Sequence, residues 1–210
     1  MTEIQIVKII MVGSMSVGKT SLVTKFATGK KLEEDKSTKN ASYVSKIKVY
    51  NKINFEIKLW DTAGQEKYKS LTKLFTKEAK IAILVYSIDN EVSFSDLDEW
   101  LKLVKSSNEE NIVLGVAANK SDLVSERKVT DERGKEYAKK IGAEWRSTSA
   151  LLENGGIDEL IDILFKKYYE TSFSMEKTTS LSLTMEDSVY QKGGCCGGGK
   201  KVYPSQPSQK

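Results

Sequence analysis

A glycine-rich octapeptide near the start of the chain constrains the fold more than any other feature. It reads Gly13-Ser14-Met15-Ser16-Val17-Gly18-Lys19-Thr20, with Ser21 directly after it, and it matches the Walker A pattern. The apolar segment 4–12 before it is typical of a strand, and residues 19–28 after it have a helical pattern. In that context backbone N–H groups surround phosphate oxygens, and the helix dipole favours their negative charge. We expect Lys19 to contact the β- and γ-phosphates of a nucleotide and Thr20 to bind Mg²⁺. A glycine turn beside an exposed lysine is the alternative interpretation.

Apolar runs alternate with helical patterns along the rest of the chain, which predicts an α/β fold with a largely parallel sheet. Further strands are expected at 43–50, 54–60, 81–88 and 112–118, the first two forming an antiparallel hairpin. Further helices are expected at 92–104, 130–141 and 157–169, whereas residues 30–42 have a polar, loop-like composition. Segment 171–192 is rich in Ser and Thr, and both prolines lie within 200–210. We therefore expect one ordered domain over residues 1–170 and a disordered tail over residues 171–210.

Composition excludes several classes of protein. The formal net charge is +4, which is too small and too dispersed an excess to indicate nucleic-acid binding. No apolar run approaches the roughly 18 residues needed to span a bilayer, and no signal peptide opens the chain, so a cytoplasmic protein is expected. The only cysteines, Cys195 and Cys196, are adjacent, and neighbouring cysteines rarely form a structural disulfide. The chain has no histidine, so any catalysis uses another base or none.

A second motif follows the predicted strand 54–60. It reads Trp60-Asp61-Thr62-Ala63-Gly64-Gln65-Glu66. An aspartate at a strand end opposite a Walker A loop commonly holds Mg²⁺, which predicts that role for Asp61. The Gly64 N–H could meet the γ-phosphate with no side chain in the way. Gln65 has both a donor and an acceptor and could therefore orient a water molecule. Alone, Asp-x-x-Gly is a common turn, and its position after the Walker A loop carries this interpretation.

A third motif is suited to recognising a nucleotide base. Asn119-Lys120-Ser121-Asp122 follows the predicted strand 112–118. The Asp122 carboxylate can accept hydrogen bonds from guanine N1–H and from its exocyclic amine, whereas adenine would leave it unpaired. Lys120 could lay its aliphatic stem along the base plane. Backbone N–H groups at Ser149-Ala150 could reach guanine O6. Each motif alone is compatible with a surface turn, and their order after the Walker A loop favours a guanine-nucleotide site.

With these motifs in this order, residues 4–170 resemble a Ras-superfamily GTPase, and Trp60–Glu66, Tyr68 and residues 85–94 resemble the Rab branch. The resemblance implies a P-loop NTPase G domain: a mostly parallel six-stranded sheet with one antiparallel strand and helices on both faces. It also implies that Thr38 is the switch I threonine, which senses Mg²⁺ and the γ-phosphate. Tyr43, Trp60 and Tyr68 would form the aromatic triad on which effectors dock. A hairpin face packed on the switch II helix is the simpler explanation of these aromatics, and both can hold together.

The same resemblance implies a switch that cycles between GTP-bound and GDP-bound states and regulates vesicle traffic. GTP and Mg²⁺ would be the cofactors, and Gln65, Lys19 and Thr38 would serve hydrolysis. Exchange factors, GTPase-activating proteins and effectors would be its partners, and the protein itself would be a monomer. Gly193-Gly194-Cys195-Cys196 is similar to the geranylgeranylated end of many Rabs. Lipidation of this cysteine pair would bring a cytoplasmic protein to the cytoplasmic face of endomembranes.

The sequence departs from the Rab pattern in four places. Lys39-Asn40 replaces Ile-Gly after the switch threonine, and Lys31, beside Leu32, replaces an aromatic residue that lies against guanine. Met15 stands where a small residue is usual and would crowd the γ-phosphate. The cysteine pair is followed by residues 197–210. Two other functions therefore stay open: a GTP-binding scaffold with negligible turnover, which Met15 favours and Gln65 opposes, and a P-loop kinase or ATPase, which the third motif opposes.

Overall fold

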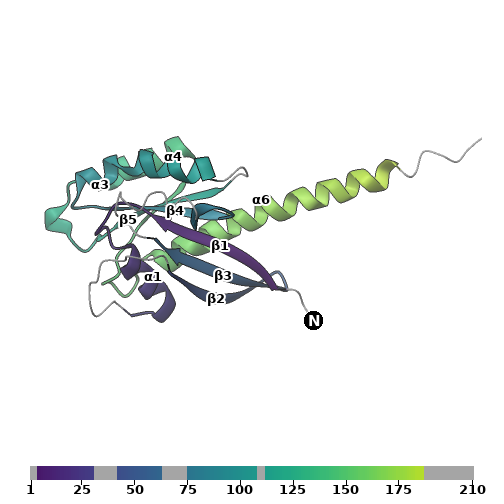
Figure 1. Ribbon diagram of the computed structural model, residues 1–210, viewed down its shortest axis with the longest axis horizontal. Coiled ribbons are helices and arrows are strands. Elements are labelled where there is room, and N and C mark those ends of the chain that lie inside the picture. The colour runs from purple at the N-terminus through teal and green to yellow at the C-terminus, as the bar shows by residue number, and fades with distance from the viewer. Residues whose placement is uncertain (1–3, 31–41, 63–74, 108–111, 187–210) are drawn as a thin grey trace, which may run out of the picture. The chain divides into compact units, whose positions relative to one another are not determined.

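The computed structural model describes residues 4–30, 42–62, 75–107 and 112–186, and it describes side chains as far as residue 172 (Figure 1). The chain divides into two units, Met1–Thr171 and Ser172–Lys210. Everything said below about packing concerns the first unit.

The centre of the first unit is a six-stranded sheet with the order β2-β3-β1-β4-β5-β6. Its strands are β1 (Ile4–Val12), β2 (Ser42–Tyr50), β3 (Ile53–Asp61), β4 (Ile81–Ser87), β5 (Val113–Asn119) and β6 (Glu144–Ser147). All neighbouring pairs are parallel except β2 and β3. The predicted fold, a mostly parallel six-stranded sheet with one antiparallel strand, is therefore confirmed. The carboxyl ends of the parallel strands meet at one edge of the sheet, where α/β proteins bind their ligands.

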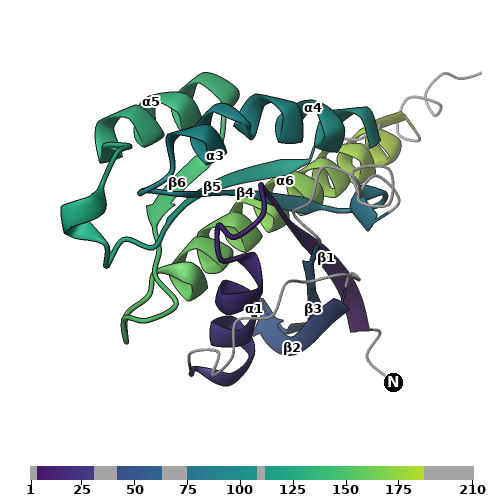
Figure 2. The same ribbon diagram turned by 60° about the vertical axis from the view of Figure 1, so that its left-hand side comes forward.

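Helices cover both faces of this sheet (Figures 1 and 2). The helices are α1 (Lys19–Thr28), α3 (Glu91–Ser95), α4 (Leu97–Ser107), α5 (Asp131–Ile141) and α6 (Ile157–Glu186), with a short 3₁₀ turn, η2 (Val124–Glu126). Lys46 of β2 reaches both helices of one face, because its Nζ lies 4.2 Å from the ring centroid of Phe26 in α1 and 3.8 Å from Asp158 Oδ1 in α6. Figure 2 shows α3, α4 and α5 on the opposite face.

The two central strands are the most deeply buried. Every residue of β4 and β5 is buried, which explains their continuous apolar sequences. On the α3–α5 face, Trp100, Leu97 and Val104 of α4 pack over Leu84 and Val116. On the other face, Phe55 and Phe165 meet edge to face with ring centroids 5.0 Å apart. A core on each face holds the carboxyl edge of the sheet rigidly.

The hairpin between β2 and β3 forms where the sequence predicts it. Its two turn residues, Asn51 and Lys52, have φ values of 48° and 65°. Positive φ at both central residues is the requirement of a type I′ turn, whose twist matches that of the paired strands. Tyr43 consequently lies directly opposite Trp60 at the far end of the hairpin.

Two helices differ from the sequence prediction. Segment 92–104, predicted as one helix, is divided at Asp96 into α3 and α4, because the Asp96 N–H donates to the carbonyls of both Val92 and Phe94 and tightens the backbone there. Helix α6 continues beyond 169, the predicted helix end, to Glu186. Residues 171–186 contain neither glycine nor proline, so nothing in their sequence forces the helix to stop.

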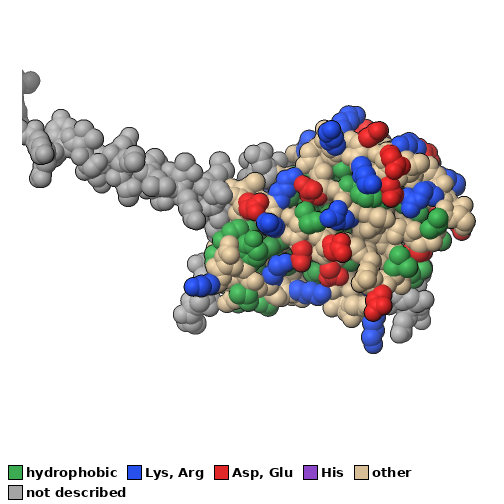
Figure 3. Space-filling view, turned by 180° about the vertical axis from the view of Figure 1, so that it is seen from behind, with side chains coloured by type: hydrophobic (Ala, Val, Ile, Leu, Met, Phe, Trp, Pro, Cys, Tyr) green, Lys and Arg blue, Asp and Glu red, His purple; other side chains and the backbone are tan. Residues whose placement is uncertain are grey.

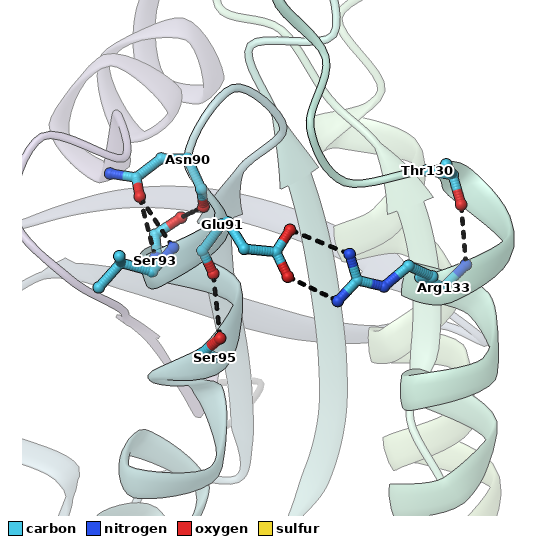
Figure 4. Close-up of polar contacts among 7 residues, drawn as sticks. Asn90, Glu91, Ser93, Ser95, Thr130 and Arg133 are labelled. Atoms are coloured by element: carbon cyan, nitrogen blue, oxygen red, sulfur yellow. Dashed lines mark hydrogen bonds and ion pairs between the residues drawn. The ribbon is translucent and has the colours of Figure 1, made fainter.

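Helix α3 is joined to α5 by a set of polar contacts shown in Figure 4. Arg133 of α5 donates to both carboxylate oxygens of Glu91, at 2.9 and 2.6 Å. Asn90 caps α3, its Oδ1 accepting from the N–H groups of Val92 and Ser93. A five-residue helix is therefore held at its first turn by a cap and by a bidentate ion pair.

The surface carries charges of both signs. In the view of Figure 3, Lys and Arg side chains are interspersed with Asp and Glu side chains. Within the described part of the chain, no helix is both long enough and apolar enough to cross a membrane.

Candidate nucleotide site

The loop between β1 and α1 has the backbone conformation that a phosphate-binding loop needs. Gly13, Ser16 and Gly18 all have positive φ, at 150°, 62° and 91°. A Cβ added at Gly13 would lie 2.2 Å from the Val85 carbonyl oxygen, and one added at Gly18 would lie 2.4 Å from Asn119 Nδ2. Both glycines are therefore required by close packing as well as by conformation.

Lys19 begins α1 and folds back over this loop. Its Nζ donates to the carbonyl oxygens of Gly13 and Ser14, both at 2.8 Å, and only 5% of the residue is exposed. Burial lowers the pKa of the ammonium group to about 8, and the Asp61 carboxylate opposes part of that change. The lysine is thus a buried, mostly protonated cation at the N-terminus of a helix.

Thr20 and Asp61 come together although they lie on different elements. The Thr20 hydroxyl donates to Asp61 Oδ2 at 2.7 Å, and Asp61 is 2% exposed. Thr62, directly after it, donates from Oγ1 to the Met11 carbonyl at 2.6 Å and fixes the end of β3 against β1. A hydroxyl and one carboxylate fit Mg²⁺, which proteins often bind through one or two carboxylates together with substrate phosphates. Among the residues that the structure describes, no group of three or more His, Cys, Asp or Glu side chains forms another metal site.

The third motif is hydrogen-bonded to the phosphate loop. Asn119 Nδ2 donates to the Val17 carbonyl at 2.7 Å in a buried contact. The Thr148 hydroxyl donates to Asn119 Oδ1 at 3.3 Å. Lys120 has a φ of 60°, a left-handed conformation that non-glycine residues adopt rarely and that often marks a functional site. The phosphate loop (residues 13–20) and the third motif (residues 119–122, called the base motif below) therefore form one hydrogen-bonded unit.

Asp122 and Ser149 form the outer part of this unit. The Ser149 hydroxyl donates to Asp122 Oδ1 and accepts from the N–H groups of Leu151 and Leu152, at 3.0 and 3.3 Å. Ala150, directly after Ser149, is 9% exposed. The two motifs that the sequence analysis assigned to guanine therefore meet at the carboxyl ends of β5 and β6.

The remaining predicted residues of the site fall into three groups. Ser21 lies in the first turn of α1, and Met15 is about half exposed, at 51%. Tyr43 and Trp60 are in contact, with ring centroids 4.8 Å apart, and Tyr43 is 49% exposed. Outside the described residues lie Lys31, Leu32, Thr38, Lys39, Asn40, Gly64, Gln65, Tyr68, Cys195 and Cys196.

Three contacts of the site could not be predicted from the sequence. Ser14 Oγ donates to Asp96 at 2.7 Å and accepts from Trp100 Nε1 at 3.3 Å, although these partners lie far along the chain. Thr148 supports Asn119, and the only signal for it is a polar residue at the end of a short strand. No local pattern could have connected Ser14 to Asp96, because only the fold brings α4 beside the loop.

A parallel sheet with a Walker A loop after its first strand, and polar motifs after three others, defines a P-loop nucleotide-binding domain. Comparison with known proteins identifies the family. The protein-family model described as Ras family matches residues 8–170 of the sequence. The chain is 38% identical to the Ras-related protein RHN1 of Nicotiana plumbaginifolia over 143 residues, which are 68% of this chain and 72% of that protein. It is 32% identical to the Ras-related protein Rab-5A of Dictyostelium discoideum over 191 residues, 90% of this chain and 94% of that protein. It is 31% identical to the Ras-related protein Rab-21 of Mus musculus over 205 residues, 91% of this chain and 92% of that protein.

The chain therefore belongs to the Ras family and is a Rab-type small GTPase, an enzyme that hydrolyses GTP to GDP and phosphate.

Proposed function

We propose that this GTPase is a switch for vesicle traffic between endomembranes, and that its nucleotide site consists of the residues assembled at the carboxyl edge of the sheet. One observation carries the proposal. Lys19 and Thr20 follow β1, whereas Asp61 and Asn119 end β3 and β5. The contacts that bring them together suit the phosphates, a metal ion and the base of one nucleotide.

In this proposal the phosphate loop binds the nucleotide mainly through its backbone. N–H groups of the loop and of the first turn of α1 donate to phosphate oxygens, and Lys19 adds a positive charge. Mg²⁺, when bound by Thr20 and Asp61, offsets the negative charge that develops on the phosphates during hydrolysis. Gln65 would orient the attacking water, the Gly64 N–H would meet the γ-phosphate, and Thr38 would sense Mg²⁺ and the γ-phosphate.

The base is selected by charge-assisted hydrogen bonds. Asp122 accepts from guanine N1–H and from the exocyclic amine, and the Ser149 hydroxyl holds the carboxylate in position. Backbone N–H groups at Ser149-Ala150 donate to guanine O6, and Lys120 covers the base plane. Adenine would leave the Asp122 carboxylate without donors, which is a strong form of discrimination.

In this proposal, effector binding and membrane attachment depend on parts of the chain outside the nucleotide site. The contacting pair Tyr43 and Trp60, completed by Tyr68, is the proposed effector surface. An exchange factor and a GTPase-activating protein set the nucleotide state of a monomeric switch. Lipidation of Cys195 and Cys196 would hold the protein on the cytoplasmic face of a membrane, and two lipid chains anchor stably where one does not.

A nucleotide competition tests the site directly. The purified chain is loaded with a fluorescent GDP analogue in Mg²⁺, and GDP, ADP and XDP are compared as competitors. GDP should displace the analogue about 10⁴-fold more effectively than ADP, the discrimination expected when polar groups of a site lose their partners. Equal competition by ADP would exclude the proposed base site. Affinity capture with the chain loaded with a GTP analogue, against the GDP-loaded chain, then tests for effectors.

A further inference from the structure

The phosphate loop is tied to α4 by the side chain of Ser14. The Ser14 hydroxyl donates to Asp96 Oδ2 at 2.7 Å and accepts from Trp100 Nε1 at 3.3 Å. Trp100 is 2% exposed and belongs to the hydrophobic core, so its ring is a fixed support. Two partners, one of them a carboxylate, leave this hydroxyl a single orientation. Hydrogen bonds to an ionised acceptor are about twice as strong as neutral ones.

The same residue holds Lys19 through its main chain. The Ser14 carbonyl accepts a hydrogen bond from Lys19 Nζ at 2.8 Å, beside the equivalent contact with the Gly13 carbonyl. The side chain of Ser14 is therefore fixed to α4 while its carbonyl positions the buried cation. A shift of Ser14 would move the carbonyl that orients the lysine.

Asp96 lies at the end of α3, a helix that is held in place by contacts at its start and its middle. Its N–H donates to the Val92 carbonyl at 2.9 Å, which closes α3. At the other end of that helix, Glu91 is held by both terminal nitrogens of Arg133 (Figure 4). Ser93, in the middle of α3, accepts from the Ser87 N–H at 3.0 Å and so binds the helix to the end of β4.

We propose that Asp96 is a positioning residue of the nucleotide site: through Ser14 it fixes the loop carbonyls that orient Lys19, and it thereby slows nucleotide release. The inference rests on the proposed function, because it assigns Lys19 to the phosphates. Asp96 acts through Ser14 and does not itself touch the nucleotide. The Asp96 carboxylate acts by accepting a hydrogen bond from the Ser14 hydroxyl. An uncharged acceptor in the same place should therefore still hold the loop and keep nucleotide release slow.

Four variants and one matched control separate this role from general stabilisation. Asp96→Ala and Ser14→Ala remove the hydrogen bond from either side, and the double variant removes both partners. Asp96→Asn keeps an acceptor oxygen without the charge. The control is Asp98→Ala, which removes an exposed carboxylate from the same segment. Asp98 accepts from the Tyr137 hydroxyl at 3.0 Å, toward α5 and away from the loop.

The measurement is the dissociation rate of a fluorescent GDP analogue from the full-length protein in Mg²⁺ with excess unlabelled GDP. Asp96→Ala and Ser14→Ala should each raise this rate about tenfold, in the range of one lost hydrogen bond to a charged group. The double variant should release the analogue no faster than either single variant, because the two single variants remove the same hydrogen bond. Asp96→Asn should stay within about threefold of the wild type, and Asp98→Ala should not differ from it.

Three results would overturn the inference. Wild-type rates in Asp96→Ala and Ser14→Ala would show that the tether does not position the loop. Additive effects in the double variant, or equal acceleration in Asp98→Ala, would show that Asp96 acts through charge or stability instead. If Asp96→Ala does not fold, Ser14→Ala and Asp96→Asn decide alone. A wild-type protein that fails to hold the analogue at all would contradict the proposed function itself.

Discussion

Gly18 is the position where one added methyl group should damage both the phosphate loop and the base motif. It precedes α1 with a φ of 91°, and a Cβ there would lie 2.4 Å from Asn119 Nδ2. That amide donates to the Val17 carbonyl at 2.7 Å in a buried contact. In Gly18→Ala the methyl group and the amide cannot both keep their places, so the Asn119 bond should break.

The other end of the same helix supplies a control. Gly29 follows α1 with a φ of 71°, and no atom lies within 4 Å of a Cβ added there. Gly29→Ala should therefore lower the free energy of unfolding only through the strain of the left-handed conformation. That loss is about 1 kcal/mol, because the lower entropy of the unfolded alanine chain offsets part of the strain. Gly18→Ala adds a steric conflict and a buried carbonyl without its donor, each worth about 1–3 kcal/mol. We expect a total of about 3–7 kcal/mol for Gly18→Ala.

Thermal unfolding of the two variants tests this difference. For a domain of this size, 1 kcal/mol lowers Tm by roughly 2–4 °C, so Gly29→Ala should lose a few degrees and Gly18→Ala at least about 6 °C. Excess GDP should stabilise Gly29→Ala as much as the wild type and Gly18→Ala much less. If the two variants melt together, the proposed conflict with Asn119 is wrong. Asn119→Ala should cost less in the Gly18→Ala background than in the wild type, because the bond to Val17 is already lost there and only the contact with Thr148 remains to be removed.

Three further predictions concern the chemistry of the site. Because the pKa of buried Lys19 is about 8 and bound phosphate favours its charged form, GDP affinity should fall as pH rises above 8, by at most about tenfold per unit. Lys19→Arg should lack this fall, and titration of the nucleotide itself cancels in the ratio of the two proteins. Asp122→Asn should weaken GDP binding by about 1.5–3 kcal/mol and shift preference toward XDP in the competition assay, and unchanged GDP affinity would remove Asp122 from the base site. Met15→Gly should raise single-turnover GTP hydrolysis by about tenfold, one lost steric conflict of about 1.4 kcal/mol, whereas an unchanged rate would mean that the half-exposed side chain points away from the γ-phosphate.

The sequence was sufficient for those parts of the fold that local patterns determine. β1 and α1 begin and end at the predicted residues, because an apolar run and a helical period flank a loop whose Gly13 and Gly18 leave no room for a side chain. The division of α3 from α4 could not be predicted, since Phe94 of α3 keeps one helical period with Leu97, Leu101 and Val104 of α4 across the boundary. The contact between Asp96 and Ser14 could not be predicted either, because it joins residues 82 positions apart and neither residue type is distinctive.

The contact between Asn119 and Val17 makes the two halves of the candidate site mechanically dependent on each other. Asn119 is fixed on three sides: its amide donates to the phosphate loop, its side-chain oxygen accepts from Thr148, and its carbonyl accepts from the Ile88 N–H at 3.0 Å. Because all three contacts lie in or beside the buried ends of β4 and β5, moving Asn119 would expose unpaired polar groups in the core. The phosphate loop therefore cannot shift at Val17 without disturbing the strand end that carries Asp122. A nucleotide bound at both ends would oppose that shift from either side, and for this reason damage at Gly18 should weaken binding of the base as well as of the phosphates.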